Sequence, residues 1–281
     1  MLRLVRLEWI KTFHKWRTYI GFAAIGFFLP LFFIAVKLGG ETEAVKFHQF
    51  SVLKEHFIIM GNLFNAFLVT RMLMMTFFVH IPFLIALMAG DVVAGEATTG
   101  TLRMILTRPP SRLQLILAKI VISLLYTFIL IMFMATLSFS LGYLLFGFGE
   151  LVLVNSNQFA ILTATESFWR CLLAYALAFL AMSVVAALAF LFSVLVENAI
   201  GPIVGTMTVV IISLIISEAP ISLFKAIRPY LFTTYASVWM KAFSEPLPWQ
   251  TILISSGYLI LFMLFFFGVA YVIFQRKDIL C

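Results

Sequence analysis

Six apolar stretches, each long enough to cross a lipid bilayer, constrain this 281-residue chain more than any other feature. An α-helix rises about 1.5 Å per residue, so about 20 apolar residues cover a hydrocarbon core of about 30 Å. The predicted spans lie near residues 18–36, 72–93, 121–146, 171–195, 201–218 and 251–274. Hydrophobic residues make up 63% of the chain and charged residues 11%, beyond the apolar share of soluble domains, about 45–50%. We therefore expect an all-α, polytopic membrane protein that forms one transmembrane domain over residues 1–281.

A shorter apolar run precedes the second predicted span. Residues 57–69 are too few to cross the core, and Arg71 follows them closely. We expect this run to form an interfacial or partly re-entrant helix that leads into the second span.

The distribution of Lys and Arg predicts the orientation of the chain. Positive residues are retained on the cytoplasmic side of a membrane, and six spans place both termini on one face. Loops on that face carry 11 of the 19 Lys and Arg in about 56 residues, while the opposite face carries 8 in about 91. We expect both termini to be cytoplasmic. The net charge of +7 then reflects membrane topology and attraction to anionic lipid, and no nucleic-acid partner is needed.

Residues 1–17 are predicted to form an amphipathic helix at the membrane surface. Five apolar residues recur at spacings of three and four and share one helical face: Leu2, Val5, Trp9, Phe13 and Trp16. Glu8, Lys11 and Lys15 fall on the other side. A basic topology anchor is the simpler alternative for this segment. It is not expected to be a signal peptide, because no cleavage site follows it.

The segment between the second and third predicted spans, residues 94–112, carries Glu96, Arg103, Arg108 and Arg112. Placing these charges in lipid would cost on the order of 10 kcal/mol, so the segment must face solvent. Gly100 permits a sharp turn and Thr101 can cap a short helix over residues 102–107, with Leu102, Ile105 and Leu106 on one face. Pro109 and Pro110 end that helix, and Ser111 can cap the third span. An ordinary cytoplasmic hairpin is the simpler alternative.

This segment resembles the corresponding part of the permease subunits of type-2 ABC exporters. The matching pattern is a Gly-Glu pair, then Gly-Thr-Leu, an apolar stretch, a Pro and a closing Ser-Arg. It stands here as Gly95, Glu96, Gly100, Thr101, Leu102, Ile105, Leu106, Pro109, Ser111 and Arg112. The resemblance implies a coupling helix that docks in an ATPase subunit, with Arg103 and Arg108 setting the register. It also implies that residues 1–17 are an elbow helix.

The resemblance further implies the partners and the location of the protein. This chain has no G-x-x-x-x-G-K-[ST] phosphate loop, so ATP and Mg²⁺ would be bound by two separate ATPase subunits. A second permease subunit, either another copy or a similar relative, would complete a complex in a prokaryotic plasma membrane. Asp91 and Glu96 are expected to pair with Arg103, Arg112, Lys119 or elbow residues. Glu96 is the residue expected to couple transport to ATP hydrolysis.

Several other features have two interpretations. Gly201 and Gly205 have the spacing of a helix contact and predict either contact with a second subunit or packing within one chain, and an alanine stripe at Ala174, Ala178 and Ala181 is equally ambiguous. The turn at Glu197 and Asn198 is implied to be a minor second contact with the ATPase. The external segment, residues 219–250, is rich in Pro, Tyr and Trp and predicts short helices at the outer surface. His80 is expected to be a buried neutral side chain, with a place in the lining of a transport path as the alternative.

Other function classes lack their motifs. The sequence holds no H-E-x-x-H, no G-x-S-x-G and no pair of intramembrane aspartates, so we assign no catalytic residue and no cofactor site, and the scattered histidines suggest no metal site. The alternative function is an ATP-independent membrane scaffold or secondary carrier. Inverted repeats would favour a carrier, and none is evident in the sequence.

Overall fold

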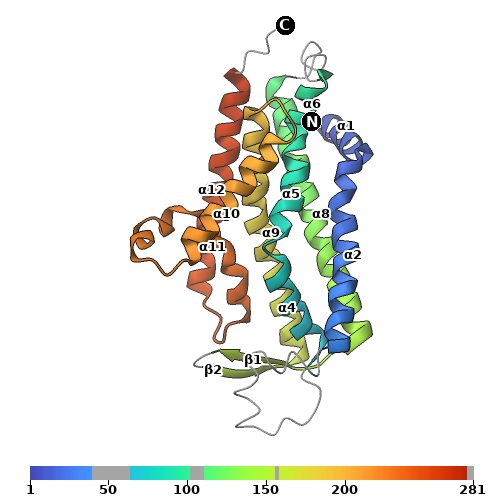
Figure 1. The fold of residues 1–281 in the computed structure, drawn as a ribbon, viewed down its shortest axis with the longest axis vertical. Helices are drawn as coiled ribbons and strands as arrows, with labels where there is room; N and C mark the ends of the chain where they lie inside the picture. The colour runs from blue at the N-terminus through green and yellow to red at the C-terminus, as the bar shows by residue number, and fades with distance from the viewer. Residues whose placement is uncertain (40–63, 102–110, 156–157, 277–281) are drawn as a thin grey trace.

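Long helices packed side by side form the body of the computed structural model, which describes residues 1–39, 64–101, 111–155 and 158–276. The N-terminus and the end of the last helix lie at the same end of the bundle, and a small β-hairpin lies at the other (Figure 1). Within the described residues, five helices are long and apolar enough to cross a membrane, and a bent pair of shorter helices makes a sixth crossing if it counts as one span.

The helices follow one another in an order close to the predicted one. The first half of the chain contains α1 (Leu2–His14), α2 (Trp16–Gly39), α4 (Ala66–Phe77), α5 (Ile81–Ala89), α6 (Asp91–Thr98) and α8 (Arg112–Phe146). The second half contains β1 (Leu151–Asn155), β2 (Gln158–Leu162), α9 (Ala164–Leu195), α10 (Gly201–Glu218), η2 (Ser222–Ala226), η3 (Arg228–Tyr230), α11 (Phe232–Ala236), η4 (Ser237–Phe243) and α12 (Trp249–Arg276).

Helix α9 is the centre of the bundle. About 78% of its apolar stretch is buried, against 22% in each of α2, α10 and α12, so the last three present most of their surface outward. Helix α9 packs against α12, α5, α8, α10 and η4. Its small residues Ala174, Ala178 and Ala181 are buried inside this one chain, which places the alanine stripe at contacts within the subunit.

The bent pair of α4 and α5 occupies the place of the span predicted over residues 72–93. It begins earlier, at Ala66, and is broken at residues 78–80 between α4 and α5, which meet at a bend of 57°. Pro82 near the start of α5 lacks a backbone N–H and cannot continue the α4 hydrogen-bond ladder. The final residues of the predicted interfacial or re-entrant run, Ala66 to Val69, are buried in the bundle, which excludes an interfacial position for them; the bent pair is either a broken span or a re-entrant segment, and residues 57–63 lie outside the described part.

The start of α4 is fixed by the outer end of α8. The Asn65 side chain accepts hydrogen bonds from the backbone N–H groups of Phe67 and Leu68 and donates one to the carbonyl oxygen of Glu150. Gly142 on α8 lies directly against Ala66, because a Cβ atom on Gly142 would be 3.0 Å from the Ala66 Cβ. This close contact brings the broken span alongside α8.

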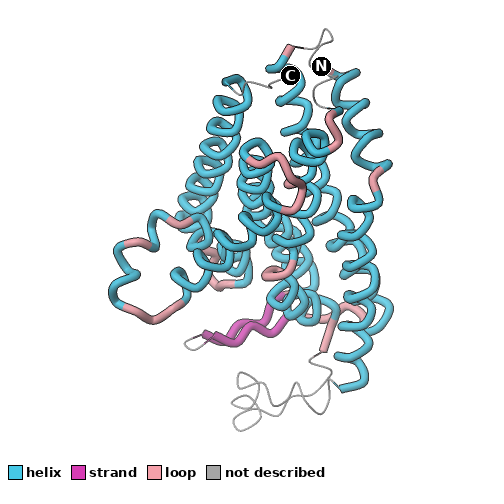
Figure 2. The backbone as a smooth tube through the Cα atoms, turned by 45° about the horizontal axis from the view of Figure 1, so that its top comes forward, coloured by secondary structure: helices cyan, strands magenta, loops and turns pink. Residues whose placement is uncertain are grey.

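The third and fourth spans are longer than predicted, and a hairpin absent from the prediction lies between them. With 35 and 32 residues, α8 and α9 measure about 52 and 48 Å and extend beyond a hydrocarbon core of about 30 Å. The antiparallel strands β1 and β2 pair Leu151 with Leu162 and Asn155 with Gln158, and Figure 2 shows them crossing the end of the bundle. The fold is therefore predominantly α-helical with one small hairpin.

The external segment forms short helices, as predicted, but these do not simply lie on the outer surface. Helix α10 has 18 residues, about 27 Å, and ends well short of the outer end of α9. Figure 1 accordingly shows the segment beside the bundle, part of the way along its length. Phe232, Trp239 and Phe243 are buried, and the rings of Trp239 and Phe78 lie 5.2 Å apart.

The Gly142–Ala66 contact makes a stability prediction. We expect Gly142→Ala to lower the free energy of unfolding by about 1–3 kcal/mol, because the added methyl group overpacks the α4–α8 interface. Gly257 has no heavy atom within 4 Å of the corresponding position, so Gly257→Ala should be neutral or stabilising by up to about 1 kcal/mol. Thermal unfolding in detergent measures both variants, and equal melting temperatures for the two would contradict this packing argument.

Candidate functional site

A cluster of charged side chains lies at the end of the bundle that holds the N-terminus. It joins four elements that are far apart in the sequence, namely α1, the start of α2, α6 and α8. We define the charge cluster by its seven residues: Glu8, Lys11, Lys15, Arg17, Asp91, Glu96 and Lys119.

Lys119 is the centre of the charge cluster. Its side chain is completely buried, and its Nζ atom lies 3.0 Å from Glu8 Oε2 and 2.8 Å from Glu96 Oε2. The same nitrogen donates a hydrogen bond of 2.9 Å to the carbonyl oxygen of Val92. A buried ammonium is stable only when it has such partners, because removing it from water carries a large desolvation cost.

The other cations of the charge cluster attach the elbow to α6. Lys11 Nζ lies 2.8 Å from Glu8 Oε1 and 3.2 Å from Glu96 Oε1. Lys15 Nζ and Arg17 Nη1 lie 2.7 and 2.9 Å from the two oxygens of Asp91. Both carboxylates of α6 are thus held by residues before or just inside the first span, and the expected pairing with Lys119 and with elbow residues is confirmed.

The pKa values of two elbow residues reflect these contacts. Burial alone would raise the pKa of Glu8, but Lys119 and Lys11 outweigh it and hold the pKa below its ordinary value of 4.5. Burial would likewise lower the pKa of Lys11, but Glu8 and Glu96 raise it above 10.5. Both side chains are therefore charged at neutral pH.

Ser193 on α9 holds the start of α6 in place. Its hydroxyl oxygen accepts hydrogen bonds from the backbone N–H groups of Val93 (3.0 Å) and Ala94 (2.9 Å), and its O–H donates to the carbonyl oxygen of Gly90 at 2.6 Å. The first N–H groups of a helix have no partner within that helix, so Ser193 supplies a cap from a distant part of the chain. At the other end of α6, Thr98 donates to the carbonyl oxygen of Glu197 in the α9–α10 turn at 2.9 Å.

The structure places four of the predicted coupling residues. Glu96 is buried in the charge cluster, and Gly100 has the positive φ (70°) that favours glycine directly after α6. Thr101 donates a hydrogen bond to the carbonyl oxygen of Glu96 at 3.3 Å. Arg112 begins α8, which Ser111 caps as predicted, and donates to the carbonyl oxygen of Gln275 at 3.1 Å. The remaining coupling residues lie outside the described part of the chain: Leu102, Arg103, Ile105, Leu106, Arg108 and Pro109.

The elbow differs from its prediction in the direction of its polar side. Helix α1 exists and Lys15 separates it from α2, while Val5, Trp9 and Phe13 pack against the core and Leu2 and Trp16 remain exposed. Glu8 was expected on the side away from the apolar residues, yet it is buried against the bundle, as is Thr12, because Lys119 and Lys11 offer Glu8 partners there. Sequence reasoning missed Glu8; a lone acidic residue in a strongly basic helix was the available signal.

Beside the charge cluster lies a cavity of about 360 Å³. Residues of the cluster line it together with Thr12, Thr18, Thr99 and Thr101. Within the described residues no group of His, Cys, Asp and Glu has an arrangement that could hold a metal ion. The chemistry available here is ion pairing and hydrogen bonding between helices.

A second, apolar cavity of about 590 Å³ lies at the break in the second span. It is formed by α2, α4, α5 and Met207 of α10, and His80 and Thr76 line it. His80 is exposed at the break, with its Nδ1 atom 3.0 Å from the carbonyl oxygen of Thr76. The expectation of a buried histidine is therefore wrong, because the missing helical turn places this side chain at the surface.

Gly201 and Gly205 lie against their own chain. The Gly201 N–H donates to the side-chain oxygen of Asn198, and a Cβ on Gly205 would be 3.6 Å from the ring of Phe192 on α9. These contacts correspond to packing within one chain, and a role in subunit contact stays a prediction.

The burial of Lys119 makes a stability prediction. We expect Lys119→Met to destabilise the protein by about 3–5 kcal/mol, because Glu8 and Glu96 would remain buried without their shared cation. Lys225→Met removes an exposed lysine and should change stability by less than about 0.5 kcal/mol. Unfolding by denaturant in detergent measures both, and a Lys119→Met protein as stable as the Lys225→Met control would refute the central role of Lys119.

The pKa of Glu8 predicts a pH dependence. A carboxyl group whose pKa is lowered by folding adds stability above its unfolded value of 4.5, and this contribution disappears as the pH falls through the folded pKa. Lys11, whose pKa is raised, contributes below 10.5 and stops contributing as the pH rises through its folded pKa. The melting temperature of the wild type should therefore exceed that of Glu8→Gln most between about pH 5 and pH 10, and the difference should shrink below about pH 4. A pH-independent difference would contradict this assignment.

Comparison with known proteins identifies a family for this fold and site. No curated protein matches the chain. A family model described as a protein of unknown function (DUF2705) matches residues 23–280. This match covers nearly the whole of the described helical bundle, including α6 and α8 with their part of the charge cluster, and the chain belongs to the DUF2705 family.

Proposed function

We propose that this chain is the transmembrane permease subunit of an ATP-driven type-2 ABC exporter in a prokaryotic plasma membrane. The observation that carries the proposal is the charge cluster, because it ties both ends of the solvent-facing segment 94–112 to the elbow. Glu96 precedes the predicted coupling helix and Lys119 follows it, and the two form an ion pair of 2.8 Å. A displacement of the segment would therefore be transmitted directly to the spanning helices.

Further contacts would transmit that displacement to the rest of the bundle. Helix α6 is held to α9 by Ser193 and to the α9–α10 turn by Thr98. Lys119 is part of α8, a helix of 35 residues that runs through to the hairpin end. Two packed elements with discrete arrangements convert a small displacement at one site into a movement of whole helices, which is what alternating access to a transport path requires.

The energy for this movement comes from outside the chain. Two ATPase subunits would bind ATP and Mg²⁺, and their closure would move the segment 94–112 of this subunit and that of a second permease subunit. The segment's Leu102, Ile105 and Leu106 would anchor it in a groove of the ATPase, with Arg103 and Arg108 against acidic residues. The chain itself has no catalytic role in this proposal.

The cargo path in this proposal lies next to the broken second span. The apolar cavity beside His80 and Thr76 opens among helices that present most of their surface outward. Its walls are almost entirely apolar, which suits a lipid-like, peptide or other amphipathic cargo.

Changing Glu96 tests the coupling. We expect Glu96→Ala to leave membrane insertion intact and to reduce transport at least tenfold, because Lys11 and Lys119 lose a shared anion next to the coupling segment. Glu218→Ala, which removes an exposed carboxylate at the end of α10, is the matched control and should transport normally. The assay follows efflux and ATP hydrolysis together; normal efflux in the Glu96→Ala complex would contradict the coupling role.

A partner experiment separates this function from an ATP-independent scaffold or carrier. The tagged wild-type chain should copurify with an ATP-hydrolysing subunit, and Leu102→Asp or Arg103→Glu should abolish that association while Arg3→Glu, in the exposed first turn of α1, should retain it. Transport by the purified chain alone, with no ATPase, would establish the alternative.

A labelling experiment tests the orientation. Thr99→Cys at the end of α6 and Lys241→Cys in η4 are both exposed positions. In intact cells a membrane-impermeant maleimide should label Lys241→Cys and spare Thr99→Cys. The reverse pattern would place the segment 94–112 outside the cell and exclude contact with a cytoplasmic ATPase.

A further inference from the structure

Arg71 differs from the other enclosed cations of this protein. Lys119 contacts two carboxylates and a carbonyl oxygen, and Arg170 contacts Glu245 and the carbonyl oxygens of Ala242 and Ser244. The Nε atom of Arg71 is buried and has no hydrogen-bond partner. Within the described residues no carboxylate forms an ion pair with its guanidinium group.

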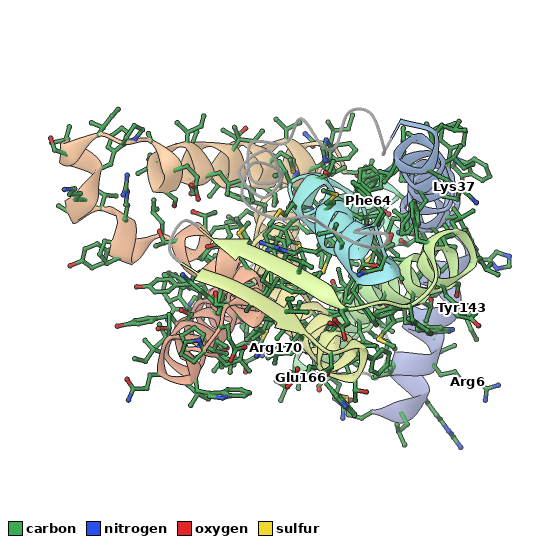
Figure 3. The ribbon with its side chains drawn as sticks, turned by 90° about the horizontal axis from the view of Figure 1, so that it is seen from below. Arg6, Lys37, Phe64, Tyr143, Glu166 and Arg170 are labelled. Carbon is green, nitrogen blue, oxygen red and sulfur yellow. The ribbon has the colours of Figure 1, made fainter. Side chains whose placement is uncertain are left out.

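The surroundings of Arg71 hold its side chain in a defined place. Its guanidinium carbon lies 5.6 Å from the centre of the buried Phe243 ring on η4, a cation–π contact. Arg170 donates a hydrogen bond to the carbonyl oxygen of Ala242, which precedes Phe243 in η4. Figure 3 shows Arg170 near the hairpin. The guanidinium therefore lies between α4 and η4, both of which pack against α9, and the residue remains partly accessible.

The depth of Arg71 in the membrane follows from the helix geometry. Gly142 and Lys119 are 23 residues apart on α8, which corresponds to about 35 Å, and Gly142 packs against Ala66 at the start of α4. Arg71 is five residues further along α4, about 7.5 Å back toward the Lys119 end. It therefore lies about 27 Å from the Lys119 level; with Lys119 at the inner boundary of a hydrocarbon core of about 30 Å, Arg71 would be close to the outer boundary. Lipid phosphate groups lie next to this level.

We propose that Arg71 binds a phosphate group at the outer face, in the site formed by α4, α9 and η4. An enclosed cation without an anion is unfavourable, and the planar guanidinium presents paired N–H donors that match phosphate oxygens. The Phe243 ring contacts the guanidinium through a cation–π interaction, which uses none of its N–H donors. The phosphate group belongs either to the headgroup of an anionic outer-leaflet lipid or to a soluble phosphate, and the site requires no ATPase partner.

The test uses the purified chain in nanodiscs of phosphatidylcholine, with and without about one quarter phosphatidylglycerol. We expect phosphatidylglycerol to raise the melting temperature of the wild type and to remain bound in native mass spectrometry. Arg71→Gln should weaken this binding about tenfold. Arg71→Lys, which keeps the charge but loses the paired donors, should have an intermediate effect. Lys241→Gln removes an exposed cation from the same η4 segment and should bind like the wild type.

A parallel titration with inorganic phosphate distinguishes the two sources. A shift with phosphatidylglycerol that depends on Arg71 supports the lipid headgroup, and a shift with inorganic phosphate that depends on Arg71 supports a soluble phosphate. The proposal is overturned if neither shift depends on Arg71, or if Lys241→Gln lowers binding as much as Arg71→Gln does. If Arg71→Gln does not fold, the Arg71→Lys protein decides, and wild-type affinity in that variant overturns the paired-donor site. Because no ATPase takes part, the result is independent of the proposed transport function.

Discussion

One buried ammonium group, that of Lys119, holds together the end of the bundle that contains the N-terminus. Lys119 brings Glu8 of the elbow and Glu96 of α6 to a single point in α8. Without the Lys119 ammonium, Glu8 and Glu96 would be buried with too little positive charge nearby to offset the cost of removing them from water. Helices α1, α6 and α8 are therefore joined at this end. The same interaction explains why a helix predicted to lie on the membrane surface turns its acidic residue inward.

The two ends of the bundle handle buried charge differently. At the N-terminal end, cations and carboxylates compensate one another within the chain. Asp91, for example, forms ion pairs with both Lys15 and Arg17. At the hairpin end, Arg170 is compensated by Glu245 and backbone carbonyls, while Arg71 has an aromatic neighbour and no carboxylate partner in the described chain. The first arrangement suits a rigid joint between helices. The second is the arrangement from which we propose a phosphate site at Arg71.

Much of the architecture could be predicted because hydropathy is a local property. The limits of α10 agree with the predicted 201–218 span, and α2 and α12 extend only two or three residues past theirs at each end. The break at residues 78–80 was harder to predict, since Pro82 permits a bend without requiring one. The hairpin was missed because Leu151–Leu162 is a short apolar run in which strand and helix patterns look alike. The position of segment 219–250 along the bundle could not be predicted, because it follows from α10 being shorter than α9.

The sequence alone determined that this is a helical membrane protein, because long apolar runs leave a chain no other way to satisfy its backbone in lipid. It also indicated that Asp91 and Glu96 pair with Arg103, Arg112, Lys119 or residues of the N-terminal helix, without deciding among them. Only the tertiary structure decided that Glu8 completes that cluster, that Ser193 caps α6 and that the buried Nε atom of Arg71 has no partner among the described residues. These contacts join residues up to 111 positions apart, and such pairings follow from how the helices pack, which no local pattern of residues encodes.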